Sequence, residues 1–217
     1  MLGIFAVTAM LYQARDPLPR ATTAETKAIA ADLRVRPDAA LTDLPFPVRR
    51  DGRILEVGAI RFVDEGDCDR PQCARYRLDA VLPGGHVGVR ASRYESGDYW
   101  VVGNAGDATA IGGKPVASPS GRYLFVGLRD DLNGESDTGI PNSIALWRSR
   151  DMQRVRAVDW PIVTLKAFVA WHGDGCVEFT GQGGGVTLPD KPRPYWLVEE
   201  PIDWVLHDTA PSACTAP

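Results

Sequence analysis

From Arg53 onward, short runs of alternating apolar and polar residues are separated by clusters of Gly, Pro, Asn and Asp. Runs of this kind are typical of β-strands joined by tight turns. No segment of this part keeps the 3.6-residue apolar repeat of an amphipathic helix. The sequence therefore predicts an all-β body with strands at residues 54–63, 74–82, 87–94, 99–102, 123–128, 144–148, 155–160, 165–171, 176–180 and 195–198.

The first 47 residues differ from this body. Residues 1–14 hold an apolar run that has the length of a signal-peptide core but is too short to span a bilayer. No Lys or Arg precedes this run, and a buried first strand is the alternative interpretation. Residues 15–47 are predicted to be a lead-in segment, either a short helix capped near Thr22 or a flexible tether. Residues 48–217 are predicted to form a single β-rich domain.

The cysteines support export. An even number of cysteines behind a signal-like start is typical of an oxidising compartment, which predicts an exported bacterial protein, periplasmic or extracellular. Four cysteines allow three pairings, and nearest-neighbour pairing is favoured here because a polar turn holds the first two close together. The long spacing between the last two argues against zinc. The favoured bridges are Cys68–Cys73 and Cys176–Cys214.

Residues 115–160 carry a recognisable pattern. Pro-Val-Ala-Ser-Pro-Ser-Gly-Arg-Tyr-Leu-Phe-Val-Gly begins at Pro115, and Ile-Ala-Leu-Trp begins at Ile144. This pattern resembles a blade of the WD-repeat and TolB-like β-propellers, with Ser120 in the place of their usual Asp. With its flanking hairpins, about half of the chain is similar to uncharacterised bacterial exported proteins that contain such blades. The resemblance implies a fold but no activity.

The resemblance makes the expected fold specific. We expect residues 115–160 to form one antiparallel sheet with a tight turn at 118–121, a long loop at 129–142 and apolar side chains on both faces. The 144–148 strand should pair with the 123–128 strand, and Trp147 should pack between neighbouring sheets. Blades of about 40 to 50 residues leave room for four at most, so the sheets should form an incomplete or irregular propeller. A β-sandwich is the alternative.

Charge narrows the range of partners. The chain carries 24 Lys and Arg against 28 Asp and Glu, a formal net charge of -4. It has no basic footprint that would neutralise phosphates, so nucleic acid is excluded as a predicted partner. Membrane contact is expected only through the N-terminal segment, if that segment is not cleaved.

One acidic loop offers oxygen ligands at alternate positions, as calcium-binding loops do. It lacks the Gly and the distal Glu of an EF-hand, because Ser136 and Asn142 stand in their places. We therefore expect no cofactor, with calcium as the alternative. Its candidate ligands are Asp131, Asn133, Glu135 and Asp137.

The histidines at 86, 172 and 207 form no metal-ligand pair at short spacing, although His172 could pair with Asp174. The serines form no nucleophile elbow. An enzyme would therefore need a carboxylate and histidine cleft lined by Glu95, Asp98 and His172.

Two aromatic pairs occur in predicted strands, and strand alternation should turn one residue of each pair inward and leave the other for binding. We therefore predict a noncatalytic binding or scaffold domain whose partner is a protein or a cell-wall component. The alternatives are a hydrolase with the cleft above and an inhibitor or immunity protein that projects loop 130–139. The candidate surface aromatics are Tyr99, Trp100, Tyr195 and Trp196.

Overall fold

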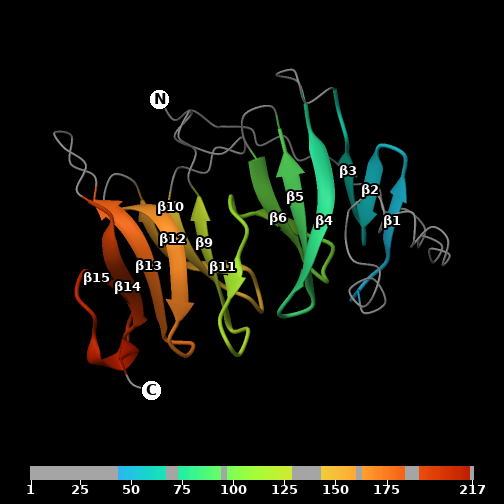
Figure 1. The fold of residues 1–217 in the computed structure, drawn as a ribbon. Helices are drawn as coiled ribbons and strands as arrows, with labels where there is room; N and C mark the ends of the chain where they lie inside the picture. The colour runs from blue at the N-terminus through green and yellow to red at the C-terminus, as the bar shows by residue number, and fades with distance from the viewer. Residues whose placement is uncertain are drawn as a thin grey trace, which may run out of the picture.

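The computed structural model describes residues 44–66, 73–93, 97–128, 143–159, 163–183 and 191–215. Within these ranges the chain is almost entirely β-structure, and its strands form four antiparallel sheets (Figure 1). In every sheet, strands that follow each other in the chain are neighbours. The all-β prediction is confirmed.

The first sheet has three strands and each of the others has four. The first sheet contains β1 (Val48–Asp51), β2 (Ile54–Val57) and β3 (Ile60–Val63). The second contains β4 (Arg75–Leu82), β5 (His86–Ser92), β6 (Gly97–Val102) and β7 (Ala108–Ala110). The third contains β8 (Val116–Ala117), β9 (Tyr123–Leu128), β10 (Ser143–Arg148) and β11 (Gln153–Asp159). The fourth contains β12 (Val163–Trp171), β13 (Cys176–Gly183), β14 (Arg193–Glu199) and β15 (Trp204–His207).

The sheets stand side by side in chain order, and a separate apolar cluster fills each space between them (Figure 1). The second and third sheets are consequently apolar on both faces, whereas each sheet of a two-layer sandwich buries only one face. The described residues therefore form a propeller-like stack of irregular blades. The clusters join Leu55 and Val57 to Val87 and Val89, Tyr99 and Val101 to Leu124 and Val126, and Phe125 and Ile144 to Val177 and Phe179.

The third sheet has the predicted pairing. β10 runs antiparallel to β9, with Trp147 opposite Leu124. Tyr123 and Phe125 face the fourth sheet, whereas Leu124 faces the second. Trp147 is half-buried against the cluster between the second and third sheets, so it packs between neighbouring sheets as predicted.

The predicted tight turn at 118–121 is also present. The backbone N–H of Gly121 donates to the carbonyl oxygen of Ser118 at 2.8 Å. Gly121 has a φ of 75°, a left-handed conformation that glycine adopts without a steric penalty. The Ser118 hydroxyl accepts a further hydrogen bond from the Tyr123 N–H at 3.1 Å.

Some strand predictions were wrong. Residues 54–63, predicted as one strand, form the hairpin β2–β3, because Gly58 takes a left-handed φ of 58° and reverses the chain. Strands β1, β7 and β15 were not predicted. Each is an edge strand of three or four residues and is too short to show an alternating pattern.

The two end faces of the stack differ in chemistry. On the outer face of the first sheet, Arg49, Glu56 and Arg61 form a charged cross-strand row. On the outer face of the fourth sheet, Trp196 and Val198 are buried beneath the C-terminal tail. A short 3-10 turn, η1 (Ser212–Cys214), ends this tail.

A disulfide fixes the tail in place. The predicted Cys176–Cys214 bridge is present, with the two Cα atoms 5.8 Å apart. Cys73 is disulfide-bonded as well, but Cys68, its predicted partner, lies outside the described residues.

The predicted signal-like segment at 1–14 and most of the lead-in at 15–47 also lie outside the described residues. Among the residues that the structure does describe, no helix is long and apolar enough to cross a membrane.

Candidate binding surface at one end of the stack

The structure does not bring together the two described residues of the alternative hydrolase cleft. Asp98 is buried in β6 of the second sheet, whereas His172 follows β12 in the fourth. The carboxylate partner of His172 is Glu178, with Nε2 to Oε2 at 2.8 Å, and not Asp174. Glu95 lies outside the described residues. The proposed cleft is therefore corrected: two of its residues belong to sheets that do not pack on each other.

The predicted surface aromatics are also corrected. Tyr99, Tyr195 and Trp196 are buried, and Trp100 is half-buried against the cluster between the first two sheets. Strand alternation leaves one residue of a pair in water only when one face of the sheet is wet. Here both faces are covered, by neighbouring sheets or by the C-terminal tail, so both members of each pair pack inside.

The predicted calcium ligands Asp131, Asn133, Glu135 and Asp137 lie outside the described residues, as does the 130–139 segment of the inhibitor alternative. Within the ranges that the structure describes, no three His, Cys, Asp or Glu side chains are grouped as a metal site would need.

The structure does gather polar side chains at one end of the stack. We call this the short-turn end, and define it by the turns at 83–85, 103–107, 118–122, 149–152 and 172–175 (Figure 1). Pro83 of the second sheet packs against Gly121 of the third. Asp174 of the fourth sheet accepts a hydrogen bond from the Ser120 N–H at 3.0 Å. Turns from three successive sheets therefore contact one another here.

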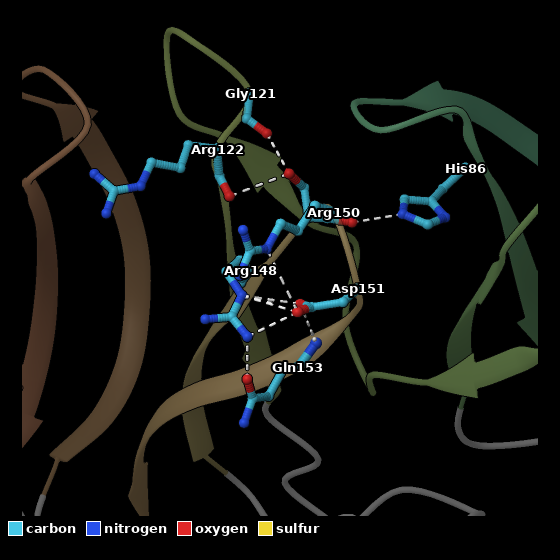
Figure 2. Close-up of polar contacts among 8 residues, drawn as sticks. His86, Gly121, Arg122, Arg148, Arg150, Asp151 and Gln153 are labelled. Carbon is cyan, nitrogen blue, oxygen red and sulfur yellow. Dashed lines mark hydrogen bonds and ion pairs between the residues drawn. The ribbon is translucent and has the colours of Figure 1, made fainter.

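Ser149 links the second sheet to the third. Its carbonyl oxygen accepts a hydrogen bond from Nε2 of His86, a buried residue at the start of β5, at 2.5 Å (Figure 2). Its hydroxyl donates to the carbonyl oxygen of Gly121 at 2.5 Å and shares the same proton with that of Arg122 at 3.1 Å. Because Ser149 is itself buried, these contacts hold the β10–β11 turn firmly against both neighbouring turns.

Glu199 links the third sheet to the fourth. The Arg122 guanidinium donates to both of its carboxylate oxygens, at 2.8 and 3.3 Å. The Tyr123 hydroxyl donates to the same carboxylate at 2.6 Å. Burial, together with this acceptor, raises the pKa of Tyr123, so the hydroxyl keeps the proton that it donates. At Asp174 the shift has the opposite direction, because hydrogen bonds from Ser120 lower the pKa of its carboxyl.

The β10–β11 hairpin projects arginines from this end. Arg148 donates to both oxygens of Asp151, at 2.7 and 3.0 Å, and also to Gln153 (Figure 2). Arg150 points outward with its side chain 75% exposed, and its Nε lies 3.6 Å from Asp151. Arg154 is exposed and lies over the Trp147 ring, 6.0 Å from its centre.

The backbone of this hairpin turn is anchored from below. Met152 has a φ of 50°, which is uncommon for a residue other than glycine. Its side chain is buried in the cluster between the second and third sheets. Burial of this side chain stabilises the unusual backbone conformation. The turn is therefore fixed both by Met152 in the core and by the hydrogen bonds of Ser149.

Asp151 makes the stability of this turn depend on pH. Its hydrogen bond with Arg148 lowers the pKa of the carboxyl from 3.8 to about 2. A lowered folded-state pKa adds stability above the unfolded-state value, and this stability is lost as the pH falls through the folded-state value. We expect Asp151→Asn to unfold at lower urea than the native protein above pH 4. The difference should disappear between pH 4 and about 2. An equal difference at both pH values would contradict this role.

Sequence reasoning missed this surface, although a signal was present. Residues 148–156 read Arg-Ser-Arg-Asp-Met-Gln-Arg-Val-Arg, with four arginines and one acid in nine residues. The net charge of -4 over the whole chain conceals this local basic run. Comparisons with protein-family models, with curated proteins and with solved structures found no match.

Proposed function

We propose that this protein is an exported, noncatalytic scaffold that binds a macromolecular partner with its short-turn end. The observation that carries the proposal is the inter-sheet polar network centred on Ser149 and Glu199. This network joins turns of three sheets into one fixed surface and holds the exposed arginines above it. A fixed surface binds with a smaller loss of conformational entropy than loops that must first become ordered.

The roles of the polar groups support a scaffold. His86, Ser149, Tyr123 and Glu199 bond to groups on neighbouring turns or strands, so their contacts hold sheets together. The similarity of residues 115–160 to propeller blades supports the same proposal, by analogy with folds that present binding surfaces. The Cys176–Cys214 disulfide and the signal-like N-terminal segment support export.

Site-specific photo-crosslinking in the producing cells tests the proposal. A photoreactive residue placed at position 150 should form an adduct with a partner, because Arg150 is exposed at the short-turn end. The control position is 61, which is exposed on the outer face of the first sheet. Adducts should form from position 150 only. Equal adducts from both positions, or none from either, would overturn the proposed surface.

A further inference from the structure

The chemistry of the short-turn end indicates what kind of partner it binds. Residues 148–156 carry a net charge of +3, four arginines less one aspartate, in a chain whose net charge is -4. The rest of the chain is therefore at -7. A positive hairpin on a negative protein produces a local attraction for anionic groups.

Every cation in this hairpin is an arginine. A guanidinium has a planar fork of donors that fits both oxygens of a carboxylate, whereas a lysine acts as a point charge. The structure shows this mode of binding twice at the short-turn end, each time with a carboxylate of the same chain. Arg148 donates to both oxygens of Asp151, and Arg122 donates to both oxygens of Glu199. Arg156 donates to a single oxygen of Asp203, at 2.8 Å.

Two arginines differ from these. In the part of the chain that the structure describes, Arg154 has no carboxylate within ion-pair distance, and its contact is with the face of Trp147. Arg150 touches Asp151 at a single nitrogen, and Arg148 already donates to both oxygens of that carboxylate. Arg150 and Arg154 therefore keep donors that face solvent.

The base of the hairpin holds these two arginines in position. Met152, which stands between the two arginines in the sequence, has its side chain in the core. Ser149, which precedes Arg150, is fixed by hydrogen bonds to two turns. The Trp147 ring supports the Arg154 guanidinium through a cation–π contact. The binding groups are consequently arranged before a partner arrives.

We propose that Arg150 and Arg154 bind the carboxylates of an acidic peptide segment in a partner protein. This inference rests on the proposed function and adds the chemistry of its partner. The two internal bidentate pairs, Arg148–Asp151 and Arg122–Glu199, favour a carboxylate over a phosphate, because they show the forks of this same surface occupied by carboxylates.

The test measures binding of a fluorescent peptide with alternating Glu and Gly to the purified full chain by anisotropy. Arg150→Glu with Arg154→Glu should weaken binding by about tenfold or more, because two attractive charges become repulsive. The control is Arg61→Glu with Lys191→Glu, which changes the net charge equally at exposed positions outside the 148–156 hairpin. It should change binding by less than about twofold. Thermal melting of each variant confirms that it is folded.

A second variant tests the role of the guanidinium fork. Arg150→Lys with Arg154→Lys keeps both charges and removes the bidentate geometry, so binding should weaken by about threefold. Equal loss in the charge-reversal and control variants would overturn the proposal, and so would full retention in both. Stronger binding of inorganic polyphosphate than of the peptide would overturn the carboxylate assignment. Crosslinking from position 150 without peptide binding would leave the surface established and show that its proposed chemistry is wrong.

Discussion

Replacing Phe125 with alanine should lower the free energy of unfolding by about 3 to 5 kcal/mol, as truncation of a buried aromatic side chain does elsewhere. Phe125 is 1% exposed, at the centre of the cluster between the third and fourth sheets. Its ring lies 5.7 Å from that of Phe168 and 5.6 Å from that of Phe179, centre to centre. Its loss would leave a cavity between two sheets, which rigid strands cannot close.

Urea unfolding of the variant, followed by circular dichroism, measures this effect. Val169→Ala is the control, because Val169 is 47% exposed on β12 and its truncation should change stability by no more than about 0.5 kcal/mol. Phe125→Leu keeps most of the volume and should recover much of the loss. If Phe125→Ala and Val169→Ala are equally stable, the third and fourth sheets do not depend on this cluster.

The fold could be predicted where local signals agreed. The turn at 118–121 has proline and glycine at positions that set the backbone locally, and β9 and β10 are long enough to show their apolar character. Short-range information therefore specified the pairing of β9 with β10 and the two apolar faces of this sheet. The number of sheets followed from blade length alone, because blades of about 40 to 50 residues limit the stack to four.

The surface could not be predicted in the same way. The contact of His86 with Ser149 joins residues 63 positions apart, and Arg122 and Glu199 are 77 apart. Such pairs depend on how sheets stack, which no local pattern specifies. The aromatic pairs failed for the same reason, because alternation alone does not reveal whether a second sheet covers the outer face.

Gly127, in β9 of the third sheet, is another residue whose role depends on how the sheets stack. A Cβ atom on Gly127 would lie 1.8 Å from Cδ2 of Leu165 on β12. Gly127 thus allows β12 to approach β9 closely, at a position that in sequence looks like a weak point of a strand.

Removing the Cys176–Cys214 disulfide should have an effect as large as that of Phe125→Ala. Cys176 and Cys214 are 38 residues apart, and a closed loop of this length is expected to stabilise the folded state by about 4 kcal/mol in the chain-entropy model. The bridge also holds the tail over Trp196 and Val198, so its loss permits water to reach an apolar strip on the fourth sheet. We therefore expect Cys176→Ala with Cys214→Ala to unfold at much lower urea than the native protein.

Measurements in reductant distinguish the contribution of the disulfide bond to stability from that of the two cysteine side chains. Cys73 is also disulfide-bonded, so both proteins lose stability from that bridge when reductant is added. With that contribution matched, the native protein and the variant should have nearly equal stability in reductant and differ by about 4 kcal/mol without it. A difference that persists in reductant would mean that packing of the two cysteine side chains contributes to the stability. A variant as stable as the native protein in oxidising buffer would show that the tail holds its place on the fourth sheet without the bond.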